Sequence, residues 1–219
     1  MMKRVMIVAP HPDDETLGCG GTILKLKKQK KEIYWVIVTN ISVKQGFSPR
    51  KVDTRQNEIE KVAKFYGFDN VYKLDYPTAM LEAISVKDII DRFSSVINKI
   101  KPDSIFIPYQ NDIHFDHRIT SQAVISCTKT FRTPFIKRLS MYEVISETEF
   151  GSSVFVPNSF CDITDYTDKK IKAMKIYKGE MGKHPFPRSE EAIMAQAVLR
   201  GATAGYKHAE AFHLLKEIW

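Results

Sequence analysis

The sequence is poor in cysteine. Its three cysteines, Cys19, Cys127 and Cys161, are odd in number and widely spaced. This pattern argues against a disulfide framework and against a thiolate zinc site, and it favours reduced thiols in a cytoplasmic protein. The apolar runs are far too short to span a bilayer, so we expect no transmembrane segment. Residues 1–9 read as a strand and are too short and wrongly followed for a signal peptide.

Two binding signatures are also missing. The GxGxxG fingerprint of dinucleotide-binding folds is absent, and residues 18–21 echo it only loosely, directly after acids that would repel a pyrophosphate. These glycines permit either close helix–sheet packing or the close approach of a ligand. No basic stripe with interleaved aromatic residues occurs, so we expect no nucleic-acid partner.

Nothing in the composition divides the chain. We find no repeat, no low-complexity segment and no composition break, so the 219 residues are expected to form a single domain, 1–219. The hydrophobic content of 43% is typical of a globular protein. The sequence leaves the oligomeric state open, and a homo-oligomer is compatible with it.

The net charge of +7 has two readings. Much of it comes from residues 25–31 and 169–175, which fit solvated helix faces. The alternative is attraction for an anionic substrate, such as a phosphate ester or a nucleotide-linked sugar.

What the sequence does contain is a regular alternation of apolar strands and amphipathic helices. It predicts strands at 5–9, 32–40, 70–76, 103–109 and 139–145, and helices at 15–31, 52–66, 86–100 and 118–131. This alternation predicts an α/β fold, a Rossmann-like open and mostly parallel sheet with helices on both faces. Beyond it we expect short extended segments within 152–163, a helix at 165–181 and a helix at 189–199. The pattern of 207–219 fits either a helix or a strand.

The chain is organised around the turn after the first strand, where one imidazole and three carboxylates fall within five residues, from His11 to Glu15. Pro10 and Pro12 end the strand and hold the turn extended. Histidine nitrogen and aspartate oxygen are good zinc ligands, and neighbouring acids repel one another unless a cation relieves them. The alternative is that Asp13 and Asp14 only cap the helix that follows.

A second polar cluster, from Asn111 to Arg118, follows the fourth strand. In doubly wound sheets the first and fourth strands lie side by side where the strand order reverses, and ligands bind at their carboxyl ends. We therefore expect the two clusters to meet in one crevice. On its own, the second cluster would read as a surface loop with incidental histidines.

These residues carry a specific resemblance. His-Pro-Asp-Asp-Glu after a first strand, with His-Xaa-Asp-His after a later one, resembles the LmbE-like (PIG-L) zinc N-deacetylase family. The resemblance is strongest over residues 3–120, with a weaker match at 209–212. Phe115 stands where the family commonly has proline, which leaves the polar residues intact. The resemblance implies the LmbE-like deacetylase fold.

The resemblance also implies roles for the first motif. His11, Asp14 and His117 would be the ligands of one zinc ion, leaving a fourth position for water as in catalytic sites. Asp13 would be the general base for that water.

In the second motif, the resemblance implies that His114 is protonated and held by Asp116. His114 would then stabilise the oxyanion or protonate the leaving amine.

Three further residues are candidates for a role in the site, and each of them also fits an ordinary structural role. Arg55 resembles an arginine that family members place near the substrate, but it also fits a helix surface. Asn111 either donates a hydrogen bond in the pocket or caps a turn. Glu210 either orients groups that lie behind the metal ligands or is an ordinary exposed acid.

The function expected from these features is that of a cytoplasmic zinc-dependent hydrolase. It would remove an acyl group, most simply acetyl, from an amino sugar or its conjugate, including phosphate- or nucleotide-linked forms, and its partner would be that small-molecule N-acetylated substrate. Two alternatives remain: a metallohydrolase of another amide or ester, and an inactive sugar-binding homologue. The intact Asp13 argues against the second, because a binding module has no need of a base.

Overall fold

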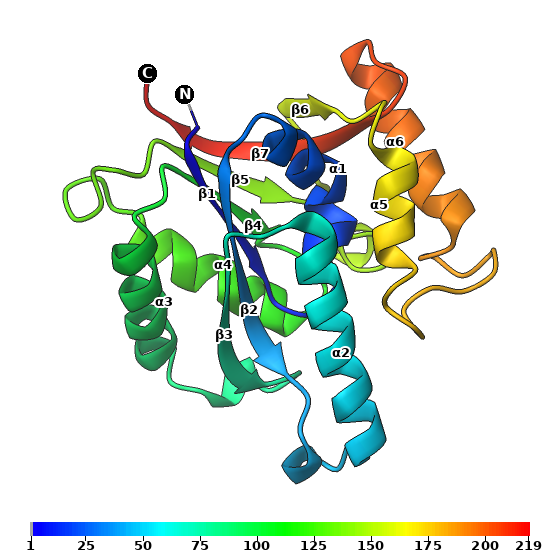
Figure 1. Ribbon diagram of the computed structural model, residues 1–219. Coiled ribbons are helices and arrows are strands. Elements are labelled where there is room, and N and C mark those ends of the chain that lie inside the picture. Colours follow the sequence, from blue (N-terminus) through cyan, green and yellow to red (C-terminus); the bar gives the residue numbers. More distant parts are fainter. Residues whose placement is uncertain (1) are drawn as a thin grey trace.

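The computed structural model describes residues 2–219, which build one seven-stranded sheet between two layers of helices (Figure 1). The strands are β1 (Arg4–Ala9), β2 (Glu32–Asn40), β3 (Asn70–Pro77), β4 (Ser104–Pro108), β5 (Arg138–Tyr142), β6 (Ser159–Asp162) and β7 (Ala209–Glu217). The helices are α1 (Asp14–Lys28), α2 (Pro49–Tyr66), α3 (Val86–Ile100), α4 (Phe115–Cys127), α5 (Thr167–Met174) and α6 (Glu190–Ala204). Short 3-10 turns lie at Val43–Gln45, Leu81–Ala83 and Thr148–Phe150.

The sheet has the strand order β3-β2-β1-β4-β5-β7-β6. The first five strands are parallel, whereas β7 runs antiparallel to both β5 and β6. The predicted adjacency of the first and fourth strands is confirmed, since Val5 pairs with Ser104 and Ile7 with Phe106. The predicted mostly parallel α/β class is confirmed as well.

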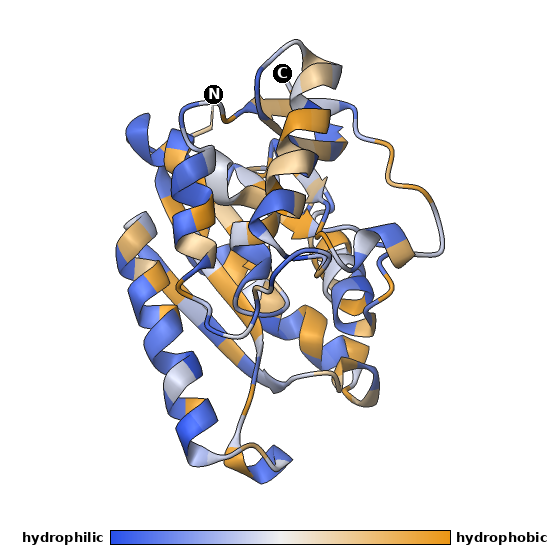
Figure 2. Ribbon diagram, turned by 90° about the vertical axis from the view of Figure 1, so that its right-hand side faces the viewer, coloured by the Kyte–Doolittle hydropathy of each residue, from blue (hydrophilic) through white to orange (hydrophobic). Residues whose placement is uncertain are grey.

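Alternate residues of β1 face two different apolar layers. Val5 and Ile7 pack in the cluster that α1, α2, α5 and α6 cover, while Met6 and Val8 pack with α3 and α4. Figure 1 shows these two groups of helices on opposite sides of the sheet. Figure 2 shows hydrophobic residues on the central strands and a largely hydrophilic α2 at the periphery. Burial on both faces explains why the parallel strands read as continuous apolar runs.

Several predicted boundaries differ from the structure, and the segment left undecided contains a strand. The helix expected at 165–181 is only Thr167–Met174, because the chain then turns and sends Tyr177 inward, where its hydroxyl donates to Glu15. The helix expected at 118–131 is Phe115–Cys127, since the His114 ring caps its start. The undecided segment 207–219 contains the strand β7.

Helix α1, which begins at Asp14, is fixed by close packing and by a buried ion pair. Gly21 lies so close to Ile163 that an added Cβ would be 2.6 Å from it, which confirms the packing role of the glycines. The Glu210 carboxylate accepts hydrogen bonds from the backbone N–H of Gly21 at 2.8 Å and of Thr22 at 2.7 Å. Lys170 on α5 donates to the same carboxylate at 2.8 Å. Glu210 is therefore a buried anchor of α1 and not an exposed acid.

No helix within residues 2–219 is long and apolar enough to cross a membrane.

Candidate active site

The turn between β1 and α1 is held from several sides. The Pro10 carbonyl accepts the Thr39 hydroxyl proton at 2.8 Å, and the Pro12 carbonyl accepts a hydrogen bond from Arg55 Nη1 at 2.7 Å. Asp13 has φ 135°, a conformation that costs free energy for a residue with a side chain. Its N–H donates to the Glu15 carboxylate at 3.1 Å. The surroundings thus hold a strained residue between the two strongest candidates for metal ligation.

His11, Asp14 and His117 come together as predicted and form a nearly equilateral triangle of ligand atoms. His11 Nδ1 lies 3.4 Å from Asp14 Oδ2, and His117 Nε2 lies 3.3 Å from both Asp14 Oδ2 and His11 Nδ1. A tetrahedral zinc ion with nitrogen and oxygen ligands holds neighbouring donor atoms about 3.3 Å apart. The three residues therefore fit zinc without rearrangement. Within residues 2–219, no fourth His, Cys, Asp or Glu joins this set.

Each histidine of the triangle is held by a carboxylate on its outer nitrogen. His11 Nε2 lies 3.0 Å from Asp116 Oδ2, and His117 Nδ1 lies 2.8 Å from Asp112 Oδ2. Such outer carboxylates fix the tautomer of a metal-binding histidine and strengthen it as a ligand. Sequence reasoning missed Asp112, although it stands in the second polar cluster and is an acid five positions before a candidate ligand.

The protein's own charges shift all three pKa values strongly. Burial lowers the pKa of His11, but hydrogen bonds to Asp116 and Asp14 outweigh it and raise that pKa to about 9. Burial also lowers the pKa of His117, but the charge of Asp14 outweighs this effect and raises that pKa to about 10. Burial raises the pKa of Asp14, but the charge of His117 outweighs it and holds that pKa well below the usual value. Both imidazoles thus hold protons tightly around one carboxylate, and a metal ion would displace those protons on binding.

A second group of potential ligands, His11, His114 and Asp116, shares one member with the triangle. It fits a metal less well because both oxygens of the Asp116 carboxylate and Nδ1 of His114 are already engaged. His114 Nδ1 accepts the Asp116 N–H at 3.1 Å. The Asp116 carboxylate accepts the N–H of Ala79 at 2.7 Å and of Leu81 at 3.1 Å, besides its contact with His11.

This arrangement corrects the expected partnership of His114 and Asp116. The Asp116 side chain supports His11, and it is only the backbone N–H of Asp116 that holds His114. Because Nδ1 of His114 is an acceptor, the ring carries its proton on Nε2. Burial and the charges of His11 and His117 lower the pKa of His114 to about 4, which argues against the charged ring that the resemblance implied.

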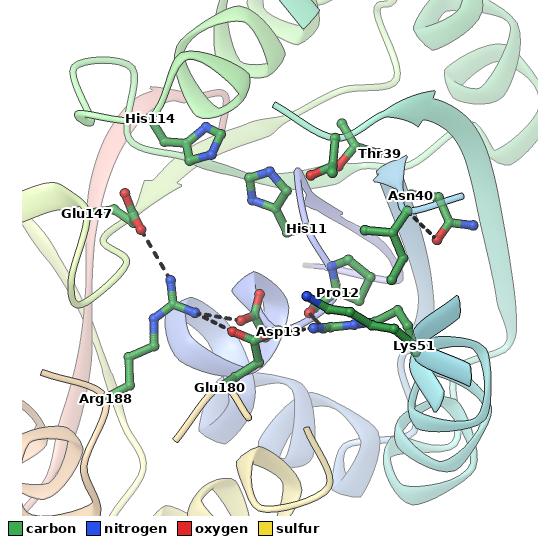
Figure 3. Close-up of a pocket in the computed structure, with 13 residues that line it drawn as sticks. His11, Pro12, Asp13, Thr39, Asn40, Lys51, His114, Glu147, Glu180 and Arg188 are labelled. Atoms are coloured by element: carbon green, nitrogen blue, oxygen red, sulfur yellow. Dashed lines mark hydrogen bonds and ion pairs between the residues drawn. The ribbon is translucent and has the colours of Figure 1, made fainter. Parts of the chain in front are cut away.

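A cavity of about 260 Å³ opens beside His11, one corner of the triangle (Figure 3). His11, Asp13 and His114 line one side of it, and the carboxyl end of β2 and the start of α2 line another. Glu147, Glu180 and Arg188 complete the wall, and sequence reasoning missed all three.

Arg188 Nη1 lies 2.8 Å from Asp13 Oδ2. Burial and the Asp14 charge raise the pKa of Asp13 well above its usual value, while Arg188 opposes that rise.

The two residues expected to bind substrate differ in their placement. Arg55 lines the cavity, but its guanidinium is engaged by the Pro12 carbonyl, by Glu180 and by Glu58 at 3.5 Å. Asn111 is not among the lining residues, and its amide donates to Ser153 at 2.8 Å. The cation of the cavity that makes no ion pair within residues 2–219 is Lys51, whose ammonium lies 5.0 Å from the centre of the Phe47 ring.

Comparison with known proteins places this geometry in a family. A family model described as PIG-L, GlcNAc-PI de-N-acetylase, matches residues 6–128. The diacetylchitobiose deacetylase of Thermococcus kodakarensis is 24% identical, with 100% of this chain and 85% of that protein aligned. A probable N-acetyl-alpha-D-glucosaminyl L-malate deacetylase 2 of Bacillus cereus is also 24% identical, over 82% of this chain and 84% of that protein.

Among solved structures, the conserved protein TT1542 of Thermus thermophilus superposes with a TM-score of 0.80 at 23% identity, covering 100% of this chain and 97% of that one. That likeness shows the fold. Because the family model covers both polar clusters and more than half of the sequence, the chain belongs to the PIG-L (LmbE-like) de-N-acetylase family.

Proposed function

We propose that this protein is a zinc-dependent N-deacetylase that hydrolyses the acetamide of an amino sugar or amino-sugar conjugate to a free amine and acetate. The observation that carries the proposal is the triangle of His11, Asp14 and His117 with Asp13 beside it at the edge of a sugar-sized cavity. Two relatives support the choice of an acetamido sugar: the diacetylchitobiose deacetylase and the probable N-acetyl-alpha-D-glucosaminyl L-malate deacetylase.

Zinc is the ion we propose, held by His11 Nδ1, Asp14 Oδ2 and His117 Nε2. Bound there, it would supply a Lewis acid that lowers the pKa of a water molecule and polarises the amide carbonyl. Asp112 and Asp116 would keep both imidazoles in the tautomer that presents a lone pair to the ion.

Asp13 is the proposed general base. It is buried, it lines the cavity, and it is adjacent in sequence to the ligand Asp14. A carboxylate whose pKa lies above its usual value accepts a proton from water more readily than an ordinary surface aspartate. The protonated Asp13 would then give that proton to the departing nitrogen, because an amine leaves only when it is protonated.

His114 is the proposed oxyanion donor. Its Nδ1 accepts a backbone hydrogen bond, so its Nε2–H is the group free to donate toward the substrate. A fixed donor directed at the carbonyl oxygen stabilises the charge that develops there. A neutral ring serves this purpose, so the role does not depend on the charged state that the resemblance implied.

We also propose that the substrate carries an anionic group, bound by Lys51 rather than by Arg55. The acids of the wall, Glu147 and Glu180, already have Arg188 and Arg55 as partners, which leaves Lys51 for the substrate. The malate conjugate named for the Bacillus cereus relative is an example of such an anion. Attraction of this kind weakens as salt screens it.

A screen of acetamido sugars tests the proposed function. Each sugar is offered in a neutral form and in a phosphorylated, carboxylated or nucleotide-linked form, and released acetate is measured against a His117→Ala control. We expect turnover of at least one sugar, with higher kcat/KM for the anionic form and a fall as salt rises. If wild type and His117→Ala both release no acetate while wild type still binds sugars, the inactive binding homologue is the better reading. Equal rates on neutral and anionic forms would refute the role of Lys51.

Cytoplasmic location remains a prediction, and a homo-oligomer is compatible with the sequence without being predicted by it. The three cysteines are free, and one of them, Cys161, is only partly buried. A partly accessible free thiol is more typical of a reducing compartment than of an oxidising one.

A further inference from the structure

Arg188 stands out among the cavity residues because no feature of the proposed reaction accounts for it. It lies in the irregular segment between α5 and α6, directly before Ser189, whose side chain caps α6 by accepting a hydrogen bond from the Ala192 N–H. Its side chain is only 15% exposed. The start of a capped helix therefore fixes where this guanidinium enters the cavity.

The Arg188 guanidinium donates hydrogen bonds to acceptors on three separate segments of the chain. Nη1 lies 2.8 Å from Asp13 Oδ2 and 3.2 Å from Glu180 Oε2. Nε donates to Ser146 Oγ at 2.7 Å, and Nη2 lies 3.2 Å from Glu147 Oε1. Figure 3 shows Arg188 reaching from its own segment to Glu147 on one side and to Asp13 and Glu180 on the other. The planar fork suits several acceptors at fixed angles, which the single ammonium of lysine cannot satisfy together.

We propose that Arg188 is the positioning residue for Asp13. By holding Oδ2, it fixes the rotation of the Asp13 carboxylate and leaves Oδ1 as the oxygen that exchanges the proton with water and the leaving amine. This inference rests on the proposed role of Asp13 as base.

Charge supports the same assignment. Without Arg188, Asp13 and Glu147 lose the cation that they share, Glu180 keeps only Arg55, and the like charges that face the cavity repel one another. Asp13 is also the residue of the three with a strained backbone, which a nearby constraint must maintain. The competing interpretation is that Arg188 only cross-links segments of the chain, as Arg200 of α6 does with Glu143 after β5, at 2.6 Å and 2.8 Å.

Arg188→Ala, Arg188→Lys and the control Arg200→Ala separate these interpretations. A displaced reacting group costs about a hundredfold in rate, so we expect Arg188→Ala to lower kcat by about that factor. Arg188→Lys should recover only part of this loss. KM and zinc content should change little, whereas the melting temperature should fall, because the buried Asp13 carboxylate loses its cation. Arg200→Ala should keep wild-type kcat, even if it melts earlier.

Chemical rescue makes the test specific. Millimolar guanidinium chloride should restore at least a tenth of the lost rate to Arg188→Ala, whereas urea, which is neutral and of similar shape, should not. A kcat within a few-fold of wild type, or a loss that guanidinium does not reverse while the variant stays folded, would overturn the inference.

Crystal structures of wild type and Arg188→Met decide the same point without a substrate. We expect the Asp13 carboxylate to turn away from its wild-type position in the variant, and an unmoved Asp13 would refute the positioning role. Failure of the proposed function would look different, because wild-type protein would then release no acetate from any sugar.

Discussion

Replacing Asp13 by asparagine is expected to lower kcat by a hundredfold or more, on the order of the loss of a general base, while the protein keeps its zinc. Asparagine has nearly the same shape, and its amide oxygen still accepts the Arg188 hydrogen bond that Asp13 Oδ2 accepts at 2.8 Å. It cannot take a proton from water. The loss should therefore appear in kcat and leave metal content unchanged.

Asp14→Asn is the matched variant, one residue along the chain. Asp14 Oδ2 forms two edges of the ligand triangle, at 3.4 Å and 3.3 Å from the two imidazoles. Losing its charge should weaken zinc by more than the roughly ten- to hundredfold typical of outer partners. Metal analysis after dialysis against a zinc buffer measures both variants. Equal loss of zinc in the two, or a fully active Asp13→Asn, would contradict this division of roles.

Lys170→Met is expected to lower the free energy of unfolding by about 3–5 kcal/mol, because it leaves a buried carboxylate without its cation. Lys170 and Glu210 are 5% and 4% exposed, and the Lys170 ammonium also donates to the Leu17 carbonyl at 2.7 Å. Methionine has a similar length, so lost packing contributes little. Urea unfolding followed by circular dichroism measures the change.

Two controls accompany Lys170→Met. Lys87→Met removes the exposed pair with Asp91, whose side chains are 80% and 61% exposed, and it should leave the unfolding midpoint unchanged because solvent screens such pairs. Adding Glu210→Gln to Lys170→Met should recover part of the stability. A Lys170→Met protein as stable as wild type would show that the ion pair does not anchor α1.

Much of the fold could be predicted from the sequence because the local hydrophobic pattern agrees with the tertiary structure. The apolar spacing that predicted a helix at 86–100 matches α3, whose buried residues Ile89, Phe93 and Ile97 lie on one face. The ends of β1 and β4 meet because the general topology of parallel sheets requires it, and that rule alone brought His11 near His117.

Residues far apart in sequence, or set by side-chain rotation, escaped prediction. Arg188 is 175 positions from Asp13 and lies in a segment without periodicity, so no spacing rule connects the two. The choice of His11 over His114 as the partner of Asp116 depends on the N–H groups of Ala79 and Leu81, which orient that carboxylate. Only a folded chain reveals such competition among hydrogen bonds.

The central claim is that His11, Asp14 and His117 together hold one divalent ion on which hydrolysis of an acetamido sugar depends. Titration of metal-stripped protein with zinc, with acetate release as the readout, tests it most directly. The account predicts no release before zinc is added, a rise in proportion to zinc that levels off near one ion per chain, and no recovery in His117→Ala. Full activity in the stripped protein, or equal recovery in His117→Ala, would contradict it.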